Sequence, residues 1–546
     1  MMKKLVTFML AMVMAFACLS ALIGCGKDRY ADYDPDNFIA DTSNPKIVKE
    51  PITITMFHPK AQIQPSWDEM RLWQEIQKIT NIKIEFREAD SSAYKDLRSL
   101  QWVNKDEWPD LFYGNNTLDE QMKYSKLGAI TPLNDDDGEW GNLLEQYAPN
   151  YMAMMEKYPE IEKQAVLDDG LMYSFTSINT VPRDLTYKMY VNKDWMEAEY
   201  GEGYEPQTVE EFKDMLIKFK DISTLNGEAI PLIGAGGGLG YVKNFILSAF
   251  GYTTSAIDVL PGTDDIVYVA ATENYKAFLK YMNDLYNEGL LYQNSYSATT
   301  ADVKAFGNKG LLGTFQGAGA FVIVGNDLDA SYTSLSPITS DYSPVVDGVP
   351  QKLHLELNGF LPQFAMMTST TPYKREIVRL IDWFYTEEAA MLATFGVENE
   401  HWEYTYDTKT NWRMILPEGT TNVETFRATL SPTAGLGAGA IGYRSYETVR
   451  YETDAANRKI NQETEKYIPY LTSFPYGLKF TEEETDRKAI IETDINNHIK
   501  QYEMEFITGK RDIESGWQGH IDALKGYGLV ELIEIYQAAY DRYMNV

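Results

Sequence analysis

The side chains best suited to metal binding and nucleophilic catalysis are few and scattered in this chain of 546 residues. No two of its five histidines stand within five residues of each other, which excludes H-E-x-x-H and similar metal motifs. They are His58, His354, His401, His498 and His520. There is also no G-x-S-x-G turn and no Walker A loop. The sequence therefore offers no catalytic motif, and we assign no catalytic residue.

One run, Gly437 to Gly442, satisfies the spacing G-x-G-x-x-G. A dinucleotide site needs a strand before that run and a helix after it. Pro432 precedes it and Tyr443 to Tyr446 open no clear helix, so we interpret it as a loop. Acidic residues are so common that the sequence does not exclude a pair of catalytic carboxylates like that of glycosidases.

The two cysteines, Cys18 and Cys25, both lie in the first 25 residues. Lys3 and Lys4 precede an apolar run from Leu5 to Ile23, the pattern of a signal peptide. The ending Leu-Ile-Gly-Cys resembles the lipobox of bacterial lipoproteins, whose cysteine receives diacylglycerol before cleavage makes it the N-terminus. This resemblance implies a signal peptide over 1–24 and lipidation of Cys25. The alternative is an uncleaved anchor helix.

The chain is strongly acidic, with 80 Asp and Glu against 49 Lys and Arg and a net charge of −31. Removal of residues 1–24 takes two lysines and no acid, so the mature charge is −33. Phosphate backbones and anionic lipid headgroups repel such a surface, which argues against nucleic acid partners. Membrane association would therefore occur through the lipid on Cys25. Residues 25–50 are polar, and we expect a flexible tether there.

The body begins with alternating strand and helix patterns. Apolar residues alternate at 52–56 and 82–86, a helical spacing lies between them, and a short apolar run follows at 109–113. A second unit starts near 187, with a strand at 230–233, a glycine-rich run at 234–240 and further helices up to a helix-rich tail at 481–546. These patterns predict an α/β protein with mainly parallel sheets flanked by helices.

Six segments in order resemble motifs of the bacterial extracellular solute-binding protein family 1, the carbohydrate-binding lipoproteins that serve ABC importers. They are Asp168 to Tyr173, Tyr190 to Trp195, Thr208 to Phe212, Phe306 to Gln316, Ile381 to Glu388 and Phe395 to Glu400. The resemblance implies a two-lobed, type II periplasmic-binding-protein-like fold with a hinge between the lobes. We expect 51–185 and 314–365 in lobe one, and 186–313 and 366–546, with a C-terminal helical extension, in lobe two.

The resemblance further implies a lipid-anchored monomer on the extracytoplasmic face of the cell membrane. It would capture an oligosaccharide by hinge closure and deliver it to an ABC permease. Two alternatives remain open at this stage: a secreted lipoprotein enzyme acting on polysaccharide, and a binding protein for a peptide or another non-sugar solute.

Ligand contacts are expected beyond the carboxyl ends of the strands and at positions that match the family. The predicted substrate-binding residues are His58, Tyr113, Asn115, Tyr187, Gln316, Glu398, His401 and Trp402. If Tyr113 contacts the ligand, its replacement by Ala should weaken binding and leave the melting temperature nearly unchanged.

Relatives often carry a calcium loop of the form D-P-N-G-N-G-x-x-D-E, with oxygen ligands at alternating positions. The matching segment, 221–231, has an extra residue before Asn226 and lacks both late acids. We therefore expect no cofactor, and Asp221 and Asn226 are the remaining calcium candidates.

Overall fold

The computed structural model describes residues 29–114, 116–234, 239–405, 411–420, 423–433, 441–453 and 455–545. The predicted signal peptide 1–24, Cys25, Asn115 and most of the runs 234–240 and 437–442 lie outside them. Within the described part of the chain, no helix has the length and apolar character that a bilayer crossing requires.

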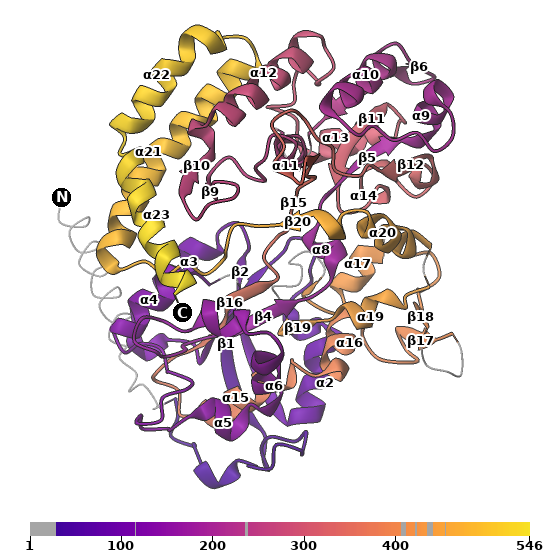
Figure 1. Cartoon of the computed structure of the whole chain (residues 1–546). Coiled ribbons are helices and arrows are strands. Elements are labelled where there is room, and N and C mark those ends of the chain that lie inside the picture. Colours follow the sequence, from indigo (N-terminus) through magenta and orange to yellow (C-terminus); the bar gives the residue numbers. More distant parts are fainter. Residues whose placement is uncertain are drawn as a thin grey trace, which may run out of the picture.

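Lobe one is built on a six-stranded sheet in the order β19-β4-β16-β3-β1-β2 (Figure 1). Its strands are β1 (Ile52–Lys60), β2 (Ile82–Asp90), β3 (Leu111–Tyr113), β4 (Phe175–Asn179), β16 (Phe360–Met367) and β19 (Tyr443–Arg444). All except β16 run in the same direction. The central residues of β1 are buried on both faces, because helices cover both sides of a parallel sheet. The predicted strand and helix alternation over 52–113 is thus confirmed.

Helices of lobe one pack on this sheet or on each other. They are α2 (Arg71–Thr80), α3 (Tyr94–Gln101), α4 (Leu118–Lys126), α5 (Leu143–Tyr147), α6 (Pro149–Lys157), α7 (Glu160–Ala165), α15 (Lys374–Trp383), α16 (Glu387–Phe395), α17 (Val423–Ala428) and α19 (Tyr446–Arg450). In α2 the spacing of Leu72, Trp73 and Ile76 points these side chains into the core. A hairpin of β17 (Trp402–Tyr404) and β18 (Trp412–Met414) lies beside α16.

Residues 29–50 pack onto lobe one, so the expected tether is wrong for this part of the chain. Phe38, Ile47 and Val48 are buried, with at most 8% of their surface exposed. The guanidinium of Arg379 donates to the carbonyl oxygens of Ile39 and Asn44. A few apolar residues without periodicity were enough to dock this polar segment, because Phe38, Ile47 and Val48 join the apolar core of lobe one.

Lobe two has a four-stranded sheet in the order β12-β5-β11-β8. Its strands are β5 (Lys188–Asn192), β8 (Ile230–Ile233), β11 (Leu312–Gly317) and β12 (Tyr332–Ser334). The surrounding helices are α9 (Lys193–Tyr200), α10 (Val209–Lys220), α11 (Tyr241–Ser248), α12 (Glu273–Asn287), α13 (Thr300–Gly307) and α14 (Phe321–Val324). Three hairpins project from it: β6 (Ser223–Thr224) with β7 (Gly227–Glu228), β9 (Ile257–Val259) with β10 (Ile266–Tyr268), and β13 (Val345–Val346) with β14 (Val349–Pro350).

The strand pairing corrects two predicted lobe boundaries. β11 pairs with β5 and β8, so residues from 314 up to β12 belong to lobe two, because a strand joins the sheet that supplies its hydrogen bonds. Helices α15 and α16 share the apolar core of lobe one, where Ile377, Leu380 and Ala393 pack. Residues 366–453 therefore extend lobe one, and the expected crossings near 313 and 366 are wrong.

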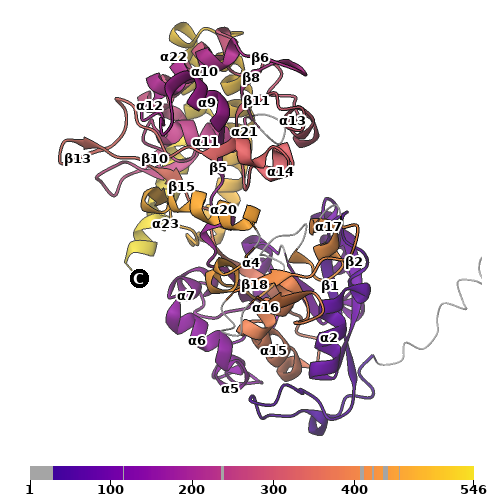
Figure 2. The ribbon, with the colours of Figure 1, turned by 90° about the vertical axis from the view of Figure 1, so that its right-hand side faces the viewer.

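Three segments connect the lobes (Figure 2). The first runs from β4 through α8 (Pro182–Leu185) to β5, as predicted for 180–190. The second passes from β15 (His354–Leu355) to β16, and the third contains α20 (Ala455–Glu465) and β20 (Leu471–Thr472), which pairs with β15. β5 and β16, each reached directly from the other lobe, run opposite to the rest of their sheets. The carboxyl ends of the remaining strands therefore point toward the opposite lobe.

The C-terminal tail forms three helices, as the sequence predicted: α21 (Glu482–Ile507), α22 (Ile513–Gly526) and α23 (Leu529–Met544). Their apolar residues, such as Ile495, Phe506 and Leu532, belong to the core of lobe two. The end of α23 returns to α7 of lobe one (Figure 2), where the Lys163 ammonium lies 5.5 Å from the ring centroid of Tyr543. The tail thus completes one lobe and touches the other.

Candidate functional site

A pocket of about 380 Å³ lies between the end of β8 and the start of α11, at the edge of lobe two that points toward lobe one. It is lined by Leu239, Gly240, Tyr241, Lys243, Asn244, Thr254, Ser255, Ala256 and Glu503. We call it the Tyr241 pocket. Gly240 has φ 51° and ψ −142°, a backbone conformation that glycine tolerates far better than other residues, and it turns the chain into α11.

Two tyrosine rings form an aromatic platform beside this pocket. Tyr241 stacks on Tyr187, with ring centroids 4.1 Å apart and planes inclined by 10°. Both side chains are half-buried, and burial, followed by the neighbouring Tyr187, raises the pKa of Tyr241. Tyr187 lies in the first connection between the lobes. Flat aromatic faces suit the C–H faces of sugar rings, which also need polar groups around their rim.

The backbone of Tyr187 is held from the second connection. His354 Nε2 donates to the carbonyl oxygen of Tyr187 over 2.9 Å, and burial lowers the pKa of His354 to about 3. Tyr476 in the third connection donates to the carbonyl oxygen of Glu356 over 3.0 Å. The platform is therefore tied to all three connecting segments, which any movement between the lobes must involve.

Polar side chains that line the pocket form an ion pair and hydrogen bonds with their neighbours. Lys243 Nζ lies 3.2 Å from Glu503 Oε2, and the hydroxyl of Tyr275 donates to the same carboxylate oxygen. Asn244 Nδ2 donates to the carbonyl oxygen of Thr253 over 2.6 Å. The lining thus combines donors and acceptors with one compensated ion pair. Among its described lining residues, Glu503 is the one that carries a carboxylate, whereas the usual glycoside hydrolases place two carboxylates across the bond that they cleave.

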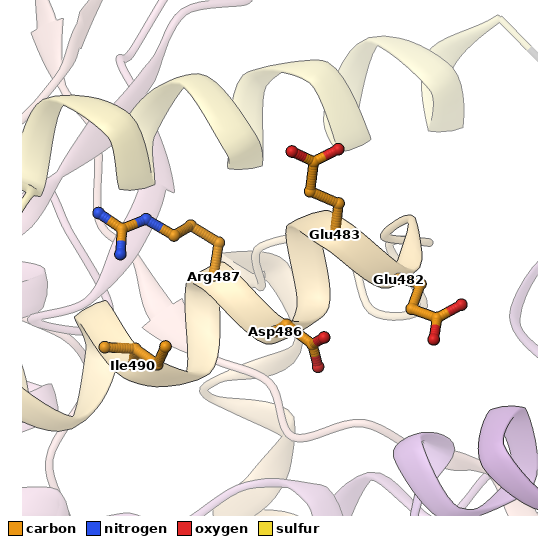
Figure 3. A pocket seen from close by; sticks show the side chains of 5 residues that line it. All are labelled: Glu482, Glu483, Asp486, Arg487 and Ile490. Atoms are coloured by element: carbon orange, nitrogen blue, oxygen red, sulfur yellow. The ribbon is translucent and has the colours of Figure 1, made fainter.

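Two other hollows lie on the tail helices. One of about 560 Å³ follows the exposed start of α21, where Glu482, Glu483, Asp486, Arg487 and Ile490 project separately from one helix (Figure 3). It has no aromatic ring, and Arg487 is already paired with Glu531 at 2.5 Å. The other, about 410 Å³, lies around His498 and Tyr527 on α21 and α22. Neither is placed at the strand ends between the lobes, so the Tyr241 pocket is the better candidate site.

Of the three lobe-one residues predicted from strand ends, His58 and Tyr113 lie inside the core, and Asn115 lies outside the described residues. His58 is fully buried, stacked 3.6 Å from Trp67, and burial lowers its pKa to about 4. Tyr113 is also fully buried and packs against Trp67 and Phe364. Neither side chain exposes any surface in this conformation. Side chains in a strand alternate between its two faces, and both of these point under a helix rather than out of the strand end.

The remaining predicted residues are widely separated. Gln316 lies in β11 opposite Met189 and is 6% exposed, near the carboxyl end that points toward lobe one. Glu398 is exposed, His401 Nδ1 accepts a hydrogen bond from the Val397 amide, and Trp402 is buried against Trp412. The last three surround the β17–β18 hairpin of lobe one, away from the Tyr241 pocket. Among the predicted residues that the structure describes, Tyr187 alone lies directly beside that pocket, and the binding roles of all of them stay predictions.

The segment that matches the calcium loop does not form a ring of oxygen ligands. Residues 223–228 form the β6–β7 hairpin, and Asn226 Nδ2 donates to the carbonyl oxygen of Lys309 over 2.8 Å. Within the described residues there is no group of three or more His, Cys, Asp or Glu side chains that could hold a metal ion. The Asn226 amide is thus engaged with the backbone of Lys309, and the calcium role of Asp221 and Asn226 stays a prediction.

The sequence interpretation missed Tyr241, Lys243, Asn244 and Glu503. The first three follow a glycine-rich run at the end of a predicted strand. Ligands are expected beyond the carboxyl ends of strands in lobe two as in lobe one, so this rule could have found them. Glu503 comes from the tail, more than 250 residues later, and nothing in its local sequence distinguishes it from the many other acids.

Comparisons with known proteins agree with this architecture. The fructooligosaccharide ABC transporter substrate-binding protein FusA of Streptococcus pneumoniae is 25% identical, over 99% of both chains. Its structure in complex with kestose has a TM-score of 0.72 at 21% identity and covers 90% of this chain and 100% of that one. An HMO-binding solute-binding protein from Bifidobacterium longum infantis has a TM-score of 0.73 at 16% identity, covering 91% and 99%.

These likenesses confirm the predicted two-lobed solute-binding fold. The family model of the bacterial extracellular solute-binding proteins matches residues 62–391, which is more than half of the chain. The protein belongs to the bacterial extracellular solute-binding protein family.

Proposed function

We propose that the protein captures an oligosaccharide between its lobes, on the aromatic platform of Tyr187 and Tyr241. The stacked pair at the lobe-facing edge of lobe two carries this proposal, because it offers a ring-sized flat surface next to paired polar groups. The full-length likeness to FusA supports a sugar ligand, and short fructo-oligosaccharides are the first compounds to test.

Capture would proceed by hinge closure. A ligand bound on lobe two favours the closed state only through the additional contacts that lobe one makes with it. Because three segments connect the lobes, closure would bend them together along a restricted path. The closed protein would then deliver its ligand to an ABC permease, as the family assignment and FusA suggest.

We further propose that residues 1–24 are a signal peptide and that Cys25 carries the lipid that holds the protein, as a monomer, on the extracytoplasmic face of the membrane. The support is the sequence Leu-Ile-Gly-Cys after an apolar run, together with the extracellular character of the family. Mass spectrometry of the mature N-terminus would detect the acyl modification directly.

A thermal-shift screen of residues 26–546 against kestose, nystose and unrelated oligosaccharides and peptides tests the binding role, with product analysis on each hit. We expect a rise in melting temperature with a set of related oligosaccharides and no product. Product formation would favour a polysaccharide-acting enzyme. A shift with peptides alone would favour a non-sugar solute.

A further inference from the structure

One carboxylate oxygen in the Tyr241 pocket is available to a ligand. Glu503 of α21 is 9% exposed and lines the pocket together with Lys243 of α11. The hydroxyl of Tyr275 and the ammonium of Lys243 both donate to Glu503 Oε2. Within the described part of the chain no hydrogen bond reaches Oε1, yet this atom keeps contact with solvent. Glu503 Oε1 is therefore open to a molecule that occupies the pocket.

Tyr275 fixes the orientation of this carboxylate. It is 1% exposed, and burial, followed by the charge of Glu503, raises the pKa of Tyr275 well above its usual value. The phenol therefore keeps its proton and donates it to Oε2. Because a carboxylate paired with an ammonium only accepts hydrogen bonds, Oε1 is a fixed acceptor that favours a ligand with a donor.

Lys243 supplies a donor next to this acceptor. Its Nζ lies 3.2 Å from Glu503 Oε2 and 3.4 Å from Ser255 Oγ. An ammonium has three protons, so one remains for a ligand. The pair thus presents a donor and an acceptor side by side. Two hydroxyl groups on neighbouring carbons of a sugar ring match it, since one can accept from Lys243 while the other donates to Glu503.

We propose that the Lys243–Glu503 pair binds two neighbouring hydroxyl groups of an uncharged sugar unit and makes the Tyr241 pocket selective for neutral over acidic oligosaccharides. This inference rests on the oligosaccharide-binding function proposed above and names the class of sugar. A hydrogen bond to a charged group is stronger than one between neutral groups, so the pair contributes more than the remaining polar lining.

The charges of the pocket disfavour an acidic sugar. Glu503 already compensates Lys243, so an incoming carboxylate finds no unpaired cation in the pair. That carboxylate would instead lie close to Glu503, and like charges repel most where protein has replaced water. The mature chain carries a net charge of −33, which adds a general repulsion of anions.

Isothermal titration calorimetry with two forms of one sugar tests the selectivity. The neutral form is kestose, or the best neutral hit of the thermal-shift screen, and the acidic form is the same sugar with its primary alcohols oxidised to carboxylates. We expect the wild type to bind the acidic form at least tenfold more weakly than the neutral form.

Glu503→Gln should bind the neutral form roughly tenfold more weakly and lose most of the discrimination. Its amide oxygen can still accept from Tyr275, but the charged acceptor is gone and Lys243 is no longer compensated. The matched control is Glu505→Gln, which makes the same charge change on the same helix. Glu505 pairs with Arg511 and Gln501 outside the pocket, so this variant should bind both forms as the wild type does.

Lys243→Met provides the opposite charge change, and it decides the matter should Glu503→Gln fail to fold. It should also weaken binding of the neutral form, but it should increase the discrimination, because Glu503 is then uncompensated. A mere loss of packing would not move the discrimination in opposite directions in the two variants.

Three outcomes would overturn the inference. A wild type that binds the acidic form as tightly as the neutral form would do so. A neutral-to-acidic ratio that stays at the wild-type value in every folded variant of Glu503 and Lys243, while Tyr241→Ala weakens binding, would overturn the inference and leave the proposed function intact. A wild type that binds no oligosaccharide would overturn both.

Discussion

The rings of Tyr187 and Tyr241 stack at 4.1 Å, although Tyr187 belongs to the first connection between the lobes and Tyr241 opens a helix of lobe two. Because His354 of the second connection holds the carbonyl of Tyr187, the orientation of this platform depends on the connecting segments. A ligand that stacks here therefore contacts the part of the molecule that changes when the lobes approach. In the proposed function, binding and closure would be coupled through this one pair of rings.

Tyr241→Ala should weaken oligosaccharide binding by roughly tenfold, because it removes one ring of the platform and exposes the face of the other. Isothermal titration calorimetry with the best ligand of the screen measures this loss. Tyr527→Ala, a half-exposed tyrosine on the tail, is the matched control and should bind as the wild type does. Equal affinities for the Tyr241→Ala variant and the control would show that the platform is elsewhere.

Tyr113→Ala should lower the free energy of unfolding by about 3 to 5 kcal/mol, the usual loss when a large buried ring is truncated. The ring is fully buried between Trp67, Trp73 and Phe364, which reverses the sequence expectation of a binding effect without a stability effect. Urea unfolding followed by circular dichroism measures the change. A variant as stable as the wild type but weaker in binding would support the original expectation.

The difference between these two tyrosines shows what the sequence could predict. Periodicity located the strand that ends at Tyr113 and the helix after Gly240, but we applied the rule of strand ends to lobe one alone. It could not tell which side chain of a strand end faces the ligand edge, since that depends on register and on the helix above. Tyr187 does lie in the first connection between the lobes, as the sequence indicated, and its binding role stays a prediction.

The sequence also could not predict which strands pair when they lie far apart in the chain, because such pairing again depends on register and on packing. β11 has the apolar character that either sheet accepts, and only its hydrogen bonds to β5 and β8 decide its lobe. Glu503 enters the pocket because α21 packs along lobe two, a contact between residues far apart in the chain. Local patterns carry no information on such contacts.

Residues 29–50 should behave as part of the folded body. Ile47→Ala should lower the free energy of unfolding by about 2 to 4 kcal/mol, because Ile47 is 1% exposed and its truncation leaves a cavity. The exposed Glu50→Ala is the control, with an expected change within about 0.5 kcal/mol. Hydrogen exchange at residues 37–49 should be slow. Fast exchange there, with no effect of Ile47→Ala, would restore the tether interpretation.

Acid should weaken the packing of α21 on α22 through two hydrogen-bonded histidines. His498 Nε2 donates to His520 Nδ1 over 3.0 Å, and His520 Nε2 donates to the carbonyl oxygen of Ala270 over 2.9 Å. Since a carbonyl only accepts, His520 carries its proton on Nε2 and accepts at Nδ1, which requires a neutral His520 ring, and His498 carries a proton on Nε2. Burial, then His520 and Arg511, lowers the pKa of His498 from 6.5 to about 4, while Glu505 acts in the opposite direction.

A lowered folded-state pKa means that the unfolded chain binds the proton more readily, so stability falls as the pH drops from about 6.5 toward 4. His498→Asn removes this titration and should flatten the dependence of the free energy of unfolding on pH over that range. Burial raises the pKa values of Asp258 and Asp382 to about 6, so their protonation stabilises the folded state as the pH falls. This contribution is the same in the wild type and in His498→Asn, and it cancels when the two curves are compared. Parallel curves for the two proteins would contradict the assignment.

The most direct test of the central claim is the electron density of crystals of residues 26–546 grown with kestose, or with the best ligand of the screen. The account predicts a sugar ring lying against the face of Tyr187 or Tyr241, with lobe one also in contact with the ligand. Ligand density along the start of α21 or around His498, with the tyrosine pair unoccupied at full ligand saturation, would contradict it.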